Sequence, residues 1–240
     1  MNPTDPKTPL DVTRKGYQKS AKAFWERENA QQTPSRRPYQ LTVCHDPKFL
    51  WFRNAKVGTC SIIALLADAG IESARKRNYH CHYPPALFRD YFKFAFVRNP
   101  WDRLVSAWKG KVIRSRDLGF RKGSICTGPA DYARLSKFEN FVDYCESQDL
   151  DNCNVHIRRQ SCLIDLNHID FLGRFETFER DLARISDHLG LDRGHGIPHE
   201  NSCTEKKPWH AYYTPDLRDR VGEMYQKDIQ IFSYEFPDSP

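Results

Sequence analysis

Apolar stretches along the chain predict strands that alternate with helices. The segments 48–53 (KFLWFR) and 92–97 (FKFAFV) are rich in aromatic and aliphatic residues, as buried strands are. Each is followed by a short loop and then by an apolar segment with helical character, over 61–69 and 101–111. A third, shorter strand is expected at 170–175. This alternation predicts a three-layer α/β fold with a central parallel sheet flanked by helices.

Further helices are expected in the second half of the chain. The segments 138–146 and 155–163 have helical patterns, and a last helix is expected to begin near Pro215. The segment 177–189 is amphipathic, and Gly190 follows it where a glycine often ends a helix.

Residues 1–40 differ in composition from the rest of the chain. They hold five of the fifteen prolines and eight basic residues against four acidic ones, a net charge of +4. This composition predicts a basic N-terminal arm that is peripheral or partly disordered, with a possible short helix over 16–29. The remainder, 41–240, is expected to form a single domain of a size that suits one core.

Composition narrows the class of protein. Hydrophobic residues make up 39% of the 240 residues, but the longest apolar run, 62–67, is far shorter than the ~20 residues that cross a bilayer. The net charge of +6 suits an anionic ligand and does not call for nucleic acid. The start of the chain shows no signal or anchor, and the eight cysteines include no C-x-x-C pair. A cytoplasmic location is therefore expected ahead of the Golgi lumen.

The loop after the first strand has the features of a phosphate-binding loop. Gly58 lets the backbone approach a phosphate, Thr59 and Ser61 offer hydroxyl groups, and Lys56 supplies positive charge. In a Walker loop the lysine follows the glycine, whereas here it precedes it, so a nucleotide kinase is disfavoured. An ordinary turn with a solvated lysine remains the alternative. The candidate loop consists of Lys56, Val57, Gly58, Thr59, Cys60 and Ser61.

A second candidate site follows the second strand, in the stretch 98–108 (RNPWDRLVSAW). Arg98 lies at the carboxyl end of the strand, where open α/β sheets bind ligands. Ser106 is expected in the second turn of the following helix, so the two side chains could clamp one phosphate. Arg103 is expected to form a salt bridge to a nearby acid, such as Asp102 or Glu179.

The two loops together resemble those of the nucleotide-sulfate-dependent sulfotransferases, in particular the carbohydrate group with the chondroitin, dermatan and heparan 2-O enzymes. The resemblance covers about residues 48–236 and departs from the family at Ala55, where proline is usual. It implies that 56–61 binds the 5′-phosphosulfate of 3′-phosphoadenosine 5′-phosphosulfate (PAPS), and that Arg98 and Ser106 bind its 3′-phosphate. It implies in-line transfer of a sulfuryl group to an acceptor hydroxyl, on a sugar or glycan, with no metal.

Two histidines offer a general base. In an extended segment, His80 and His82 of 79–83 (YHCHY) fall on one face, and a neutral imidazole can take the proton of an acceptor hydroxyl. The heparan 2-O enzymes have a similar His-x-His pair before the second loop. His82 is the expected base, and His80 either orients the acceptor or serves as the substitute base. A pair of surface histidines is one alternative; a metal site, which lacks further ligands at standard spacing, is another.

Other residues are candidates by resemblance alone. His156 lies in a segment similar to an acceptor-cleft segment of the same group, where Arg158 and Arg159 could meet an anionic acceptor; a solvated helix face is the alternative. Lys206 lies in a loop that, by resemblance, closes over the nucleotide. A small natural product or a lipid is the alternative acceptor. The rival classes are a P-loop nucleotide kinase and a non-catalytic module that binds polyanions through the basic arm.

Overall fold

The structure is a computed structural model, in which the chain forms two compact units. The described residues are 33, 35–71, 79–121, 124–191 and 207–237. Most of the predicted arm, its helix at 16–29 and Lys206 lie outside these residues. Unit 1 comprises Met1–Asn54, Gly58–Phe96 and Leu163–Glu200, and unit 2 comprises Ala55–Val57, Val97–Cys162 and Asn201–Pro240.

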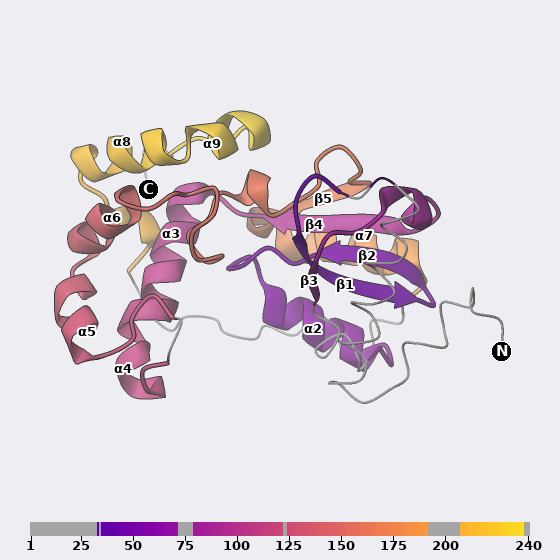
Figure 1. Cartoon of the computed structure of the whole chain (residues 1–240), viewed down its shortest axis with the longest axis horizontal. Coiled ribbons are helices and arrows are strands. Elements are labelled where there is room, and N and C mark those ends of the chain that lie inside the picture. Colours follow the sequence, from indigo (N-terminus) through magenta and orange to yellow (C-terminus); the bar gives the residue numbers. More distant parts are fainter. Residues whose placement is uncertain (1–32, 34, 72–78, 122–123, 192–206, 238–240) are drawn as a thin grey trace. The chain divides into compact units, whose positions relative to one another are not determined.

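Unit 1 is built on a five-stranded sheet of order β3-β1-β2-β4-β5 (Figure 1). β2 and β4 pair in parallel, whereas β1 pairs antiparallel with both β2 and β3. The apolar pattern thus predicts β2, β4 and β5 correctly and misses β1, whose apolar residues are interrupted by the fully buried Thr42. The strands are β1 (Tyr39–His45), β2 (Lys48–Phe52), β3 (Tyr79–Cys81), β4 (Phe92–Val97) and β5 (Phe171–Arg174).

Helices flank this sheet. α2 (Thr59–Asp68) follows β2, and α7 (Phe178–Leu189) follows β5, on opposite sides of the sheet (Figure 1). α7 lies along β4, because the rings of Phe178 and Phe96 are 5.1 Å apart between centroids. The predicted α/β class, with a central sheet flanked by helices, is confirmed. Among the residues of this unit that the structure describes, the short 3-10 turns are η2 (Pro85–Phe88) and η5 (Phe175–Thr177).

Unit 2 is helical and has its own hydrophobic cluster, in which Phe141 and Val221 are fully buried. In the part of the chain that the structure describes, no helix is long and apolar enough to cross a membrane. The helices are α3 (Pro100–Trp108), α4 (Ser115–Leu118), α5 (Pro129–Leu135), α6 (Phe138–Glu146), α8 (Pro215–Met224) and α9 (Gln226–Phe232). Shorter elements are the π-helical turn η3 (Lys109–Ile113) and the 3-10 turns η4 (Gln160–Cys162) and η6 (Trp209–Tyr212).

One predicted helix of unit 2 is wrong. The segment 155–163 forms turns and the short η4, not a continuous helix. The carbonyls of Val155 and Arg158 accept hydrogen bonds from a buried arginine side chain instead of from later amides. The predicted helices at 138–146, at 177–189 and from Pro215 are confirmed.

β5 approaches β4 so closely at Gly173 that no side chain fits there. A Cβ on Gly173 would lie 2.5 Å from Cε1 of the fully buried Phe96. Gly173→Ala should therefore lower the free energy of unfolding by ~1–3 kcal/mol, as overpacking of a dense core does. Chemical denaturation measures the change. Gly128→Ala is the matched control, because its Cβ would meet nothing within 4 Å; equal losses in both variants would contradict the steric argument.

Candidate functional site

The loop between β2 and α2 has a backbone that demands glycine at one position. Gly58 has a φ of +82°, and a Cβ there would lie 2.5 Å from Cε2 of Phe178. Lys56 also has a positive φ, of +71°, in a region where a lysine is strained. Such strain persists only where the surroundings hold the backbone, and it is common at functional sites.

The second half of this loop leads into the start of α2. Gly58 is the N-cap residue and has no side chain to bond the first amides, the arrangement in which a helix start favours an anion. Thr59 donates its hydroxyl to the carbonyl of Asn54 over 3.0 Å, so this hydroxyl closes the loop. Ser61 is buried, whereas Cys60 is exposed. The predicted phosphate-binding loop therefore offers backbone amides more than hydroxyl groups.

Arg98 links the two predicted phosphate-binding loops within unit 2. Its Nε and Nη2 donate to the two carboxylate oxygens of Asp102 over 2.8 and 2.7 Å, and Nη1 donates to the carbonyl of Lys56 over 3.1 Å. Asp102 and Ser106 lie four residues apart on α3 and share a face of it. The structure thus brings the guanidinium of Arg98 towards the face that carries Ser106.

Arg103 does not form the salt bridge that the sequence predicts. This side chain is almost wholly buried, and its Nε donates to the carbonyl of Ala55 over 3.0 Å. Nη1 and Nη2 donate to the carbonyls of Arg158 and Val155 over 2.8 and 3.0 Å. The predicted partner Asp102 is bonded to Arg98 instead. Burial lowers the pKa of Arg103, and each of its three nitrogens donates to one backbone carbonyl.

The ammonium group of Lys56 lies against the π-helical turn η3. A Cβ on Gly110 of that turn would lie 2.6 Å from Nζ of Lys56. A larger residue at position 110 would displace the ammonium group. Single π-helical turns within helices are frequent at functional sites, where they shift the residues that follow.

His156 lies among cations in the same unit. Burial, and then the charges of Lys111, Lys56 and Arg103, lower its pKa to about 3, so the imidazole is neutral at physiological pH. Its Nδ1 is buried and has no hydrogen-bond partner. The structure thus places this predicted acceptor residue in the electrostatic surroundings of Lys56.

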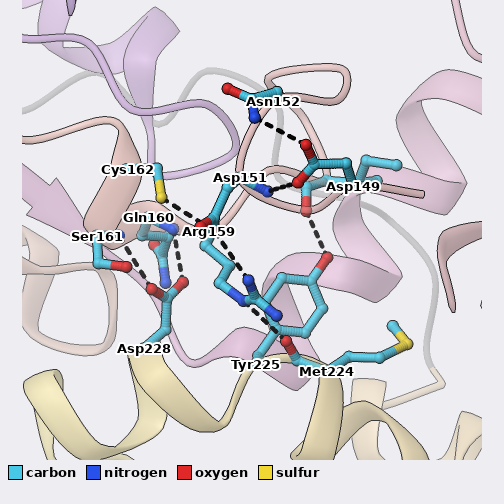
Figure 2. Close-up of polar contacts among 11 residues, drawn as sticks. Asp149, Asp151, Asn152, Arg159, Gln160, Ser161, Cys162, Met224, Tyr225 and Asp228 are labelled. Carbon is cyan, nitrogen blue, oxygen red and sulfur yellow. Dashed lines mark hydrogen bonds and ion pairs between the residues drawn. The ribbon is translucent and has the colours of Figure 1, made fainter. Parts of the chain in front are cut away.

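The two arginines after His156 have structural partners. Arg158 donates from Nε to the carbonyl of Cys153 over 2.9 Å, and Nη2 reaches the same carbonyl. Arg159 donates to the carboxylate of Asp151 over 2.8 Å and to the carbonyl of Met224 over 3.0 Å (Figure 2). Both guanidinium groups therefore hold the backbone of unit 2 together.

The predicted pair of histidines lies at an edge of the sheet of unit 1. His80 is opposite Gln40, whose carbonyl accepts from the amide of Arg53 just after β2. The pair thus lies at the end of the sheet where β2 enters the loop, two strand spacings or ~10 Å to the side. Both side chains are exposed, and Nδ1 of His82 lies 2.8 Å from the carbonyl oxygen of Ser35.

Sequence reasoning missed three contributors to the site. They are Asp102 as the partner of Arg98, Gly110 beside Lys56, and Asp228, whose carboxylate accepts hydrogen bonds from the backbone amides of Gln160 and Ser161. The spacing of four residues between Arg98 and Asp102 is a signal that could have found the first. Nothing in the local sequence marks the other two. Among the described residues, no three His, Cys, Asp or Glu side chains are arranged to hold a metal ion.

Comparison with known proteins identifies the family. The model of the Sulfotransferase family matches residues 39–235, which include both loops and most of the chain. The chain belongs to the sulfotransferase family. The resemblance of the two loops is thus confirmed at the level of the family, and the match extends through both units.

Two curated relatives of this chain carry the name carbohydrate sulfotransferase. Carbohydrate sulfotransferase 12 of Mus musculus is 25% identical over 185 residues, which are 66% of this chain and 43% of that protein. Carbohydrate sulfotransferase 14 of Mus musculus is 27% identical over 195 residues, 74% and 48% of the two chains. The chain thus spans about half the length of these two relatives. No solved structure matches it significantly.

The buried guanidinium of Arg103 should be essential for stability. Arg103→Lys keeps the charge but cannot bond three carbonyls with a planar fork, so the free energy of unfolding should fall by ~2–4 kcal/mol. Urea denaturation measures the loss. Arg134→Lys is the matched control, because the side chain of Arg134 is 58% exposed and should tolerate the change. Unchanged stability of Arg103→Lys would show that these hydrogen bonds are dispensable.

Proposed function

We propose that this protein transfers a sulfuryl group from PAPS to a hydroxyl group of a carbohydrate. Family membership supports sulfuryl transfer, and the printed names of the relatives support a carbohydrate acceptor. The observation that carries the proposal is the hydrogen bond from Arg98 to the carbonyl of Lys56. This hydrogen bond joins two loops. The sequence of one resembles the loop that binds the 5′-phosphosulfate of PAPS, and the sequence of the other resembles the loop that binds its 3′-phosphate.

Each loop would hold one end of the donor. The loop 56–61 would hold the 5′-phosphosulfate through the amides after Gly58 and through the charge of Lys56. Arg98 and Ser106 would hold the 3′-phosphate. The two-bond pair with Asp102 fixes the plane of the Arg98 guanidinium, so this side chain needs little ordering when it meets a phosphate.

The reaction would be an in-line displacement at sulfur. The acceptor oxygen forms a bond to sulfur while the bond from sulfur to the bridging oxygen breaks, and the nucleotide 3′,5′-bisphosphate leaves with the electron pair. Negative charge develops on the bridging oxygen, where the ammonium group of Lys56 would stabilise it. The proton of the acceptor hydroxyl passes to a general base.

A histidine is the proposed base. His82 is our first candidate, because its imidazole is exposed at the end of the sheet where β2 enters the loop, with His80 beside it to orient the acceptor. His156 is the second candidate, because it lies in the field of Lys56 and is neutral.

Mass spectrometry of the protein incubated with PAPS and a panel of acceptors tests this function. A sugar or glycan should gain one sulfuryl group, whereas phenols, lipids and reactions with ATP and Mg²⁺ in place of PAPS should show no product. Lys56→Ala should lower kcat ~10²-fold or more and raise the donor KM less, because the charge it stabilises develops in the transition state.

Lys48→Ala, at an exposed lysine of β2, is the control for Lys56→Ala and should keep full turnover. A Lys56→Ala variant with normal kcat would show that Lys56 only binds. Turnover of ATP, or the absence of sulfated product from every acceptor, would contradict the proposed function.

The pH dependence of kcat/KM separates the two candidate bases. An ordinary histidine base loses activity as the pH falls through ~6.5, because the protonated imidazole cannot accept the proton. His156, with a pKa lowered to about 3, would leave the profile flat from pH 5 to pH 7 (roughly the range in which histidines titrate). We expect a ~10²–10⁴-fold loss of kcat in His82→Ala, the range for loss of a positioned general base.

His168→Ala, at an exposed histidine of unit 1, is the control for His82→Ala. A flat profile together with a loss of turnover in His156→Ala would reassign the base to His156.

A further inference from the structure

The backbone of Arg98 is held by a side chain, in the way that a neighbouring strand would hold it. The amide of Arg98 donates to Oε1 of Gln160 over 3.0 Å, and Nε2 of Gln160 donates to the carbonyl of Arg98 over 2.8 Å. One primary amide thus supplies the donor and the acceptor that a strand partner supplies to one residue. β4 ends at Val97, so Gln160 bonds the first residue beyond the strand.

Gln160 is itself fixed from the opposite side. Its side chain is fully buried. The carboxylate of Asp228, a fully buried residue of α9, accepts from the backbone amides of Gln160 and Ser161 over 2.6 and 3.0 Å (Figure 2). Charge-assisted bonds of this kind hold the start of the turn η4 firmly. A chain of contacts therefore runs from α9 through Gln160 to Arg98.

The geometry permits only one orientation of this amide. If the side-chain amide of Gln160 were reversed, a donor would face the amide of Arg98 and an acceptor would face its carbonyl. Gln160 is fully buried and both hydrogen bonds are partly buried, so this mismatch would leave polar groups unsatisfied at a cost in stability. Gln160 thus sets the position of the Arg98 backbone, while Asp102 sets the plane of its guanidinium.

We infer that Gln160, held by Asp228, is a positioning residue for recognition of the donor's 3′-phosphate. This inference rests on the proposed function, in which Arg98 binds that phosphate. Gln160 acts through Arg98 and does not touch the donor. Loss of its amide therefore weakens only those ligands that carry a 3′-phosphate. A merely structural role would weaken all nucleotides alike, or none.

Calorimetric titration with adenosine 3′,5′-bisphosphate and adenosine 5′-monophosphate tests the inference. Gln160→Met keeps the length of the side chain and removes both hydrogen bonds. The ratio of the two affinities should fall ~10–100-fold, the loss seen when the orienting partner of a metal ligand is removed. Affinity for the monophosphate should stay within the wild-type range. Gln226→Met, at an exposed glutamine of α9, is the matched control and should keep the wild-type ratio.

Asp228→Asn is the second variant, for use if Gln160→Met does not fold. It keeps the shape of the side chain and weakens its hold on the Gln160 amide, so the ratio should fall in the same direction by a smaller factor. A wild-type protein that binds both nucleotides equally would refute the proposed function. A wild-type protein that prefers the bisphosphate, with variants that keep this preference in full, would refute the role of Gln160 alone.

Discussion

The guanidinium of Arg103 is the interaction on which the site in unit 2 depends. It bonds the carbonyl of Ala55 on one side and those of Val155 and Arg158 on the other. The residue after Ala55 is Lys56, and the residue after Val155 is His156. A single buried side chain therefore brings a lysine and a histidine that are a hundred residues apart in sequence into the same electrostatic surroundings. Only a planar fork of donors can bond three carbonyls in this way, which is why lysine is a poor substitute.

Two guanidinium groups hold the strained backbone of Lys56, one on each side of the residue. The carbonyl before it is bonded by Arg103, and its own carbonyl is bonded by Arg98. A positive φ at a non-glycine residue costs of the order of 1–3 kcal/mol and persists where the surroundings determine the backbone fully. Both arginines come from the segment 98–103, at the junction of β4 and α3. The backbone at the start of the first loop, at Ala55 and Lys56, is thus held by residues of the second.

The sequence predicts the parts of this fold that depend on local pattern. Continuous apolar runs identify β2 and β4. The two loops are recognisable because Lys56 and Gly58 follow β2 directly and Arg98 follows β4 directly. The helix expected at 155–163 fails because Arg103 takes two of its carbonyls, which no local pattern reveals. The predicted acidic partner of Arg103 is wrong for a related reason, because no local pattern shows that backbone carbonyls surround this side chain. A buried guanidinium can be satisfied by carbonyls, and their positions are fixed by the tertiary fold alone.

Three local costs converge around Lys56. Its φ is positive, His156 keeps a buried Nδ1 without a hydrogen-bond partner, and the helix beside it widens into a π-helical turn at Gly110. Cations also gather there, since the charges that lower the pKa of His156 are those of Lys111, Lys56 and Arg103. Each feature opposes stability, and departures from local consistency tend to mark functional sites.

By contrast, the contacts of Gln160 with Arg98 and Asp228 are complementary, donor to acceptor. The surroundings of Arg98, which is proposed to bind the 3′-phosphate, are thus rigid. The strain lies at Lys56, close to the place where negative charge would develop during transfer.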